Sequence, residues 1–172
     1  MRILGIDPSV RYTGFGIIQC SQNSCEVETF GVIKPFSHQS FPYKINQIKN
    51  RIEELITQYR PEEVAVESLF YAQNIKTAIT LGQARGAALI AVASQNCSLF
   101  EYSPLEIKKA ITGYGQADKN QVKFMIRSLL HIQNEKIPTD ASDALAAALC
   151  HAHSRIYHQT LRKNLQRNKK NK

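Results

Sequence analysis

The hydrophobic positions of the chain follow two different periods, which predict strands in some segments and helices in others. Short apolar or alternating runs predict five strands, at residues 2–7, 14–20, 24–34, 63–68 and 97–103. Apolar residues at helical spacing predict five helices, at 43–59, 75–94, 105–112, 119–130 and 138–153. The Ala-rich helix at 75–94 is apolar on several faces, so we expect it to be buried.

The order of these elements indicates the fold class. The first three strands are joined by short turns, which predicts an antiparallel meander, and strands and helices alternate after it. We therefore expect an α/β fold, in which a mixed five-stranded sheet is flanked by helices in a single domain.

Length and composition favour a soluble globular protein. The chain has 172 residues, of which 43% are hydrophobic and 21% are charged, and these values are ordinary for one such domain. The sequence contains no apolar run near the roughly 20 residues of a membrane helix, and its N-terminus has no signal-peptide pattern. We therefore expect a cytoplasmic protein without a membrane partner, whose four cysteines are reduced and mostly buried.

Positive charge is concentrated at the C-terminal end of the chain. The formal net charge is +8, and residues 155–172 contain seven Lys or Arg and no acids. We therefore expect a folded domain at 1–157 and a basic, flexible tail at 158–172. Such a tail either keeps the protein soluble or contacts nucleic acid, and the sequence leaves both alternatives open.

Four acids occupy positions where an acid is costly. Asp7 ends the apolar strand at 2–7, and Glu67 follows the apolar residues of the strand at 63–68. Asp140 and Asp143 are spaced i, i+3, which places both on one face at the start of the last helix. The helix dipole alone would explain Asp140, but Asp143 lies among alanines. Because sites form where strand ends meet, we expect these acids to share one crevice.

The clustered carboxylates predict a metal site. Gathering them without a cation would cost several kcal/mol in repulsion and desolvation. Hard divalent cations such as Mg²⁺ take oxygen ligands, and no Cys or His lies among the four acids, which argues against zinc. Two such ions about 4 Å apart can activate water and stabilise the leaving oxygen in phosphodiester hydrolysis.

The segment from Lys76 to Arg127 adds a second chemical signal. It contains seven Lys or Arg and three acids, which gives a net charge of +4 (7 − 3). A run of charge is usually a solvated helix face. Beside an acidic metal site, however, a phosphate-binding surface is the better interpretation.

Five ordered blocks of the sequence resemble the RuvC-type Holliday-junction resolvases. From residue 1 to residue 153 the chain contains, in order, LGIDPSVRYTGFG, VAVESLFYAQN, LGQARGAALIA, EYSPLEIKKAITGYGQADKNQV and TDASDALAAALCHAH. The resemblance implies a ribonuclease H-like nuclease domain at 1–157, a homodimer, and Mg²⁺-dependent endonuclease action on four-way DNA junctions in recombination and repair. It also implies paired nicks by in-line attack of water, with 5′-phosphate and 3′-hydroxyl ends, and a branch-migration motor as partner.

The same resemblance implies roles for individual residues. The family's four catalytic acids and metal ligands fall on Asp7, Glu67, Asp140 and Asp143, with two Mg²⁺ expected per site, which Mn²⁺ can replace. The family's basic residues near the scissile phosphate fall on Lys108 and Lys119, and an aromatic that contacts bases at the junction centre falls on Phe70. One position departs from the family, which commonly has glycine where this chain has Ser9. Glycine would permit a positive φ, so we expect a slightly different turn after Asp7 without loss of activity.

The sequence leaves three alternatives to a junction resolvase. The first is a related ribonuclease H-like nuclease that acts on structured RNA. The second is an ATP-binding protein, because GIDPSVRYTGFG also looks like the phosphate-binding turn of actin-like ATPases and sugar kinases, but those proteins need two such domains. The third is a junction-binding module without catalysis, against which the complete set of acids argues.

Overall fold

The computed structural model describes the chain apart from residues 22–23, 69–73, 134 and 171–172, and apart from the side chains of 156–170. The strands are β1 (Arg2–Asp7), β2 (Thr13–Cys20), β3 (Cys25–Ile33), β4 (Glu63–Glu67) and β5 (Ser98–Tyr102). The helices are α1 (Phe41–Tyr59), α2 (Ile75–Ser94), α3 (Pro104–Thr112), α4 (Lys119–Leu129) and α5 (Thr139–Lys170). The predicted order and type of these elements are confirmed.

The strands form one mixed sheet in the order β3-β2-β1-β4-β5. β1 pairs with β2, and β2 with β3, in antiparallel register, as predicted for the meander. β4 joins the other side of β1 in parallel, and β5 pairs in parallel with β4. The C-terminal ends of β1, β4 and β5 therefore lie at the same edge of the sheet.

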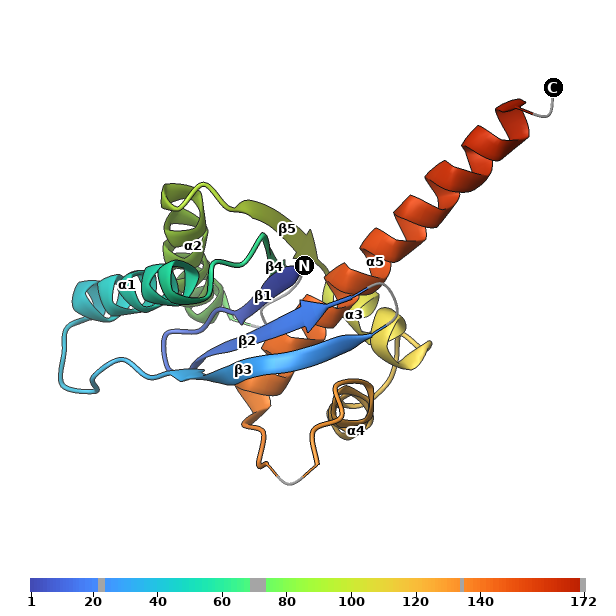
Figure 1. Cartoon of the computed structure of the whole chain (residues 1–172). Helices are drawn as coiled ribbons and strands as arrows, with labels where there is room; N and C mark the ends of the chain where they lie inside the picture. The colour runs from blue at the N-terminus through green and yellow to red at the C-terminus, as the bar shows by residue number, and fades with distance from the viewer. Residues whose placement is uncertain (22–23, 69–73, 134, 171–172) are drawn as a thin grey trace.

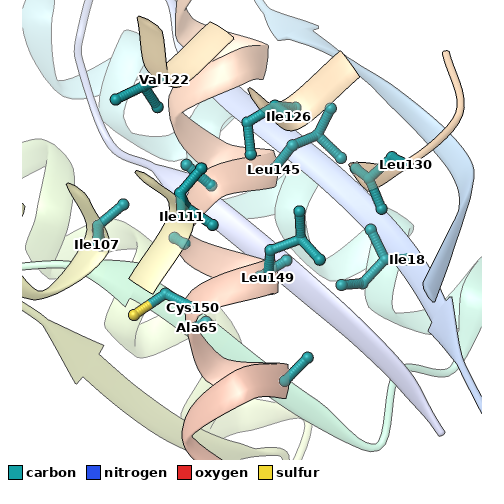
Figure 2. Packing of buried hydrophobic residues seen from close by; sticks show 14 of the residues in the cluster. Ile18, Ala65, Ile107, Ile111, Val122, Ile126, Leu130, Leu145, Leu149 and Cys150 are labelled. Atoms are coloured by element: carbon teal, nitrogen blue, oxygen red, sulfur yellow. The ribbon is translucent and has the colours of Figure 1, made fainter. Parts of the chain in front are cut away.

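Helices cover both faces of this sheet (Figure 1). On one face, α1 and α2 pack over β1, β2 and β4 in an apolar cluster that includes Ile17, Ile52 and Val64. On the other face, α3, α4 and α5 form a second cluster with the sheet, and Figure 2 shows Leu145 of α5 beside Ile126 of α4 within it. The sheet is thus the middle layer of three.

Glycines let α5 approach the sheet closely. A Cβ atom built at Gly5 of β1 would lie 1.9 Å from the carbonyl oxygen of Ala144. A Cβ atom built at Gly14 of β2 would lie 1.9 Å from the carbonyl oxygen of Asp140. A side chain at either position would push α5 outward, so the two glycines allow the start of α5 to lie directly against β1 and β2.

Helix α2 is buried on one side only, which corrects the expectation of burial on several faces. Its buried residues are Ala84, Ala87, Ala88, Ala91 and Val92. The opposite side carries what we call the α2 stripe, which consists of Ile75, Ile79, Gly82, Gly86 and Ile90. The three isoleucines are 80%, 57% and 60% exposed, and no described atom lies within 4 Å of a Cβ atom built at either glycine. Small alanines suffice for the core contact, so the larger apolar side chains of this helix face outward.

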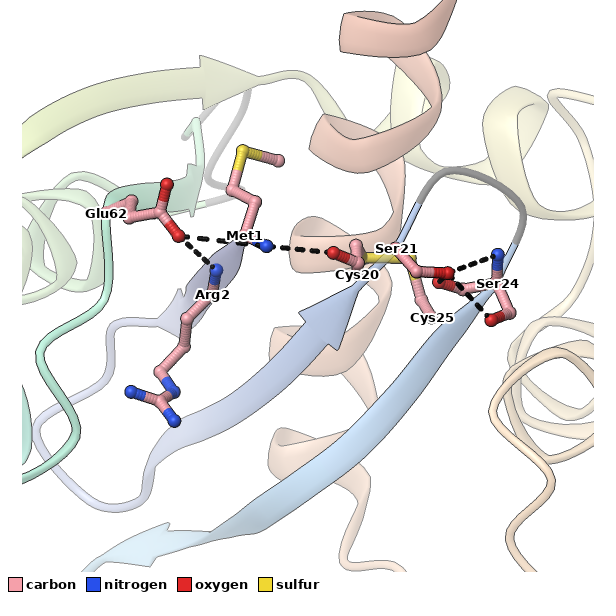
Figure 3. Close-up of a disulfide and its surroundings, with 7 residues drawn as sticks. All are labelled: Met1, Arg2, Cys20, Ser21, Ser24, Cys25 and Glu62. Atoms are coloured by element: carbon pink, nitrogen blue, oxygen red, sulfur yellow. Dashed lines mark hydrogen bonds and ion pairs between the residues drawn. A yellow bond between two sulfur atoms is a disulfide. The ribbon is translucent and has the colours of Figure 1, made fainter.

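Two cysteines at the β2–β3 turn form a disulfide, so the expectation of four reduced cysteines is wrong for this pair. Cys20 and Cys25 are partners in the β2–β3 register, and their Cα atoms lie 4.1 Å apart. Figure 3 shows the bond at the end of the hairpin. The hairpin register brings the two sulfurs together, which sequence spacing alone does not reveal. Cys97 and Cys150 are free.

Helix α5 is longer than the sequence predicted. We expected a helix over 138–153 and a flexible tail at 158–172, whereas α5 continues to Lys170 and extends away from the sheet in Figure 1. The boundary of the nuclease domain at residue 157 stays a prediction. Despite the length of α5, none of the helices in the described part of the chain is long and apolar enough to cross a membrane.

Candidate active site

Two acids stand side by side at the C-terminal edge of the sheet. Asp7 is the last residue of β1, and Glu67 is the last residue of β4. The two strands are parallel neighbours whose register pairs Ile6 with Val66. The acids that follow these residues therefore occupy adjacent strand positions, and hydrogen-bonded strands lie roughly 4.8 Å apart.

Helix α5 brings two further acids to this edge. Asp140 and Asp143 lie at the start of the helix, where it packs against Gly14. Asp143 lines the same hollow as Asp7 and Glu67. Asp140 does not line that hollow, but its charge acts on both Asp7 and Asp143. Three of the four predicted acids thus line one hollow, and the fourth lies close enough for its charge to act on two of them.

The hollow that these acids line has a volume of about 540 Å³. Lys108 of α3 and Lys119 of α4 also line it, together with apolar side chains such as Ile107 and Val122. Both helices begin at capping boxes, Ser103 with Glu106 for α3 and Asp118 with Gln121 for α4, and each box supplies acceptors for N–H groups at the start of its helix. The helices thereby bring two lysines to the acids.

Burial and mutual repulsion disfavour ionised acids in the hollow. Burial, followed by repulsion from Glu67, Asp143 and Asp140, raises the pKa of Asp7 to about 7. Burial and the charge of Asp143 also raise the pKa of Glu67. The pKa of Asp143 is raised because burial outweighs the attraction of Lys119. The hollow therefore concentrates negative charge that its own residues do not neutralise.

Lys119 supplies part of the missing positive charge. Its Nζ donates a hydrogen bond to Asp143 Oδ2 at 3.2 Å, and the charge of Asp143 raises the pKa of Lys119. The side chain of Lys119 is 74% exposed, so it is free to turn toward another anion that enters the hollow.

The donor chemistry of the hollow fits a hard divalent cation, because carboxylate oxygens are its preferred ligands. A cation would also relieve the repulsion that raises the pKa of Asp7. As the side chains lie, no group of three His, Cys, Asp or Glu in the described residues is spaced to hold a metal ion. Mg²⁺ usually takes only one or two carboxylates and completes its coordination with water and substrate oxygens, so its binding does not depend on such a group of three.

The other residues predicted to contact DNA have different outcomes. Phe70 falls outside the described residues, so its predicted contact with DNA bases has no structural description. In the basic segment, Arg85 pairs with Glu101 at 2.6 Å, and Arg127 donates to the backbone carbonyl of Glu135 at 2.7 Å. These two arginines serve the fold, whereas Lys108 of α3 and Lys119 of α4 line the hollow with the acids.

A second hollow, which the sequence did not predict, adjoins the acidic one. Its lining includes the basic residues Arg11, Lys34, Lys44 and Lys76. The first three stand far apart in the sequence and form no charge run. The fourth, Lys76, begins the basic segment for which the sequence predicted a phosphate-binding surface.

That turn does not need the family's glycine. Among the described residues, positive φ values outside glycine occur only at Arg60, Asn96 and His131. Ser9 is therefore unstrained. Its N–H donates to Thr13 Oγ1 at 3.1 Å, and Thr13 Oγ1 donates to the carbonyl oxygen of Ser9 at 2.6 Å. Ser9 fits the turn as it is.

Comparison with known proteins identifies the family. The family model described as "Crossover junction endodeoxyribonuclease RuvC" matches residues 3–151. A protein of that name from Alkaliphilus metalliredigens is 44% identical over 154 residues, which cover 90% of this chain and 94% of the relative. Another, from Geobacter sulfurreducens, is 44% identical over 162 residues, which cover 94% of this chain and 98% of the relative. The solved structure of T. thermophilus RuvC in complex with Holliday junction substrate matches with a TM-score of 0.87 and 30% identity, over 92% of this chain and 96% of that one. With its ribonuclease H-like fold and its matching sequence, this chain belongs to the RuvC family of crossover junction endodeoxyribonucleases.

Proposed function

We propose that this protein is a Mg²⁺-dependent endonuclease that resolves four-way DNA junctions by paired nicks in recombination and repair. The observation that carries the proposal is the hollow in which Asp7, Glu67 and Asp143 meet Lys108 and Lys119. Family membership supports the substrate, because the T. thermophilus relative was solved with a Holliday junction. Acids for a metal ion beside cations for a phosphate are the two parts that phosphodiester hydrolysis needs.

The four predicted acids are our candidates for catalysis and metal binding. Asp7 and Glu67 are fixed at strand ends, and Asp143 faces them from α5, so these three would hold Mg²⁺ or Mn²⁺. Asp140, on the same helix, is the fourth proposed metal ligand, and its negative charge acts on Asp7 and Asp143. We propose two ions per site, which supply an activated water and stabilise the leaving oxygen.

Lys108 and Lys119 are our candidates for binding the scissile phosphate. Both line the acidic hollow. Once a cation neutralises Asp143, the attraction that holds Lys119 there weakens, and its ammonium group can pair with a phosphate oxygen instead. Phe70 is proposed to contact bases at the junction centre, and this assignment rests on the resemblance to the family.

The α2 stripe supports a homodimer. Paired nicks require two active sites, and this chain carries one. A twofold interface places the same surface on both partners, so that surface must be self-complementary. The α2 stripe is apolar and uncharged, and its two glycines leave room for the backbone of a second helix. A second copy of this chain therefore fits the stripe.

Two further assignments follow from the family resemblance. We propose a branch-migration motor as a partner and the cytoplasm as the location. Association with such a motor would be measured by co-purification of the full-length chain.

A cleavage assay tests the proposed function. The substrates are a four-way DNA junction, duplex DNA of the same sequence and a structured RNA, each incubated with and without Mg²⁺. We expect paired nicks in the junction only with Mg²⁺, and little cleavage of the other two. Preferential cleavage of RNA would contradict the proposal in favour of the related ribonuclease.

The variant Asp7→Asn tests the role of the acids. Cleavage should fall to background because a metal ligand is lost, whereas junction binding should persist because the basic residues are intact. Asp118→Asn is the matched control, since asparagine also caps helices well and Asp118 lies outside the lining of the hollow. Nicking by Asp7→Asn at the wild-type rate would remove Asp7 from the mechanism.

A further inference from the structure

The basic hollow next to the acids has a volume of about 650 Å³. Its walls come from the β1–β2 turn, the segment after β3, the first turn of α1 and the first two turns of α2. Ser9 and Leu81 line both this hollow and the acidic one. The two hollows therefore adjoin, with these two residues between them.

The charges in this hollow all have one sign. Its charged lining residues are Arg11, Lys34, Lys44 and Lys76, with no acid among the described residues that line it. Among the described residues, none of these four takes part in an ion pair. Four cations gathered in one concave surface repel one another and create a positive potential that attracts an anion.

Local contacts hold several of these groups in place. The backbone of Ser9 is fixed by its two hydrogen bonds with Thr13, and its Oγ accepts from the N–H of Arg11 at 3.4 Å. Lys34 Nζ lies 5.4 Å from the centre of the Tyr12 ring, which is within the range of a cation–π contact. The strand that ends in the catalytic candidate Asp7 therefore continues directly into the wall of the basic hollow.

The number of cations indicates the kind of anion. A single phosphate group carries at most about two negative charges, which four cations exceed. Successive phosphates of a nucleic-acid strand supply one charge each and suit cations contributed by several segments. Hydroxyl groups of Ser37 and Thr77 also line the hollow and can donate to phosphate oxygens.

We propose that the basic hollow binds backbone phosphates of the DNA strand that passes through the acidic hollow. The proposal rests on the proposed junction nuclease function and adds a second set of DNA contacts to it. Lys108 and Lys119 come from helices on one face of the sheet, whereas Lys44 and Lys76 of the basic hollow come from α1 and α2 on the other face. A DNA strand bound in both hollows would be contacted by cations on both sides of the phosphate that lies next to the acids.

Salt dependence of binding provides the test. The affinity of a labelled four-way junction is measured by fluorescence anisotropy over a KCl series, in EDTA so that no cleavage occurs. Each lost phosphate contact lowers the slope of log Kd against log[KCl] by about 0.9. We expect Arg11→Ala and Lys76→Ala each to lower the slope by about one and to weaken binding about eightfold near 0.1 M salt. In the double variant Arg11→Ala/Lys76→Ala, the slope should fall by about two.

Two control variants separate contact from net charge and from folding. Arg51→Ala removes the same charge from the exposed side of α1, where Arg51 pairs with Glu54 outside the hollow, and should leave the slope unchanged. Arg11→Lys keeps the charge and should keep the slope near the wild-type value. Thermal melts of all variants confirm that each is folded.

Unchanged slopes in Arg11→Ala, Lys76→Ala and the double variant would overturn the inference. An equal fall in slope for Arg51→Ala would do the same, because the effect would then come from net charge. Displacement of the junction by millimolar inorganic phosphate at constant ionic strength would identify a small-anion site instead of a strand site. The proposed function is tested separately, because the slopes are measured without cleavage. It would be contradicted if the wild-type protein with Mg²⁺ left the junction intact.

Discussion

Asp7 connects the electrostatics of the site to the stability of the protein. Its pKa is raised from 3.8 to about 7 in the folded state, so the folded state binds a proton more tightly than the unfolded chain does. Without metal, the free energy of unfolding should therefore fall as the pH rises from about 4 to 7. At about 1.4 kcal/mol per pKa unit, the difference between 3.8 and about 7 corresponds to a penalty of roughly 4 kcal/mol at pH 8.

The prediction is that Asp7→Asn stabilises the metal-free protein at pH 8, and that this gain disappears near pH 4. Urea unfolding in EDTA at both pH values measures the difference. Glu54→Gln, which changes an exposed acid on α1 that is 56% accessible, serves as the control and should show little change. An equal free energy of unfolding for the wild type and Asp7→Asn at pH 8 would contradict the prediction.

At the residue scale, the sequence predicted the acids better than the cations around them. Asp7 and Glu67 could be recognised because an acid at the end of an apolar strand is unusual, and the structure brings both together with Asp143. Their catalytic roles stay predictions. Lys34 and Lys44 could not be recognised, because each is an ordinary surface cation until the fold places it beside Arg11.

At the scale of single elements, the contact between α5 and the sheet controls the geometry of the site. Gly5→Ala should place a methyl group against the backbone oxygen of Ala144, and backbone cannot move aside as a side chain can. We expect destabilisation of about 1–3 kcal/mol or more. We also expect slower junction cleavage, because α5 carries Asp140 and Asp143.

Gly31→Ala is the matched control for this prediction. A Cβ atom at Gly31 would lie 2.9 Å from the ring of Phe15, a half-buried side chain that can shift. Chemical unfolding and cleavage rates are measured for both variants. Equal losses of stability and of cleavage rate in the two variants would show that the close approach of α5 to β1 does not cause the effect of Gly5→Ala.

The elements differ in how well their surroundings could be predicted. The bounds of β1 and α2 match the sequence prediction because long apolar runs and helical spacing are strong signals. The exposure of the α2 stripe was missed because isoleucine indicates burial on average and the sequence does not show which side meets the sheet. The disulfide was missed because it depends on the register of β2 and β3.

At the scale of the whole molecule, assembly is the feature most open to test. Ile79→Glu places a charge in the middle of the α2 stripe, where a twofold contact would bring it close to its copy. We expect the wild-type protein to be a dimer in solution and Ile79→Glu to be a monomer that makes single, unpaired nicks. Sedimentation measures the mass, and a junction assay that separates single from paired nicks measures the outcome.

Phe124→Glu provides the control for this experiment. Phe124 is an apolar residue on α4 that is 70% exposed and lies outside the α2 stripe. This variant should remain a dimer. A dimeric Ile79→Glu variant would show that the subunits meet through another surface.

The parallel pairing of β1 with β4 also bears on whether the enzyme or the DNA deforms when the two bind. Asp7 and Glu67 end two strands that hydrogen bonds hold at a fixed separation, and Asp143 comes from a helix seated on glycines with no space to slide inward. Such a centre has little freedom to adjust to different substrates. We therefore expect the elastic cost of forming the complex to fall mainly on the DNA, and the enzyme to favour the nucleic acid that bends most easily at the point of cleavage. A four-way junction, whose strands already part at the crossover, meets that requirement more easily than a continuous duplex.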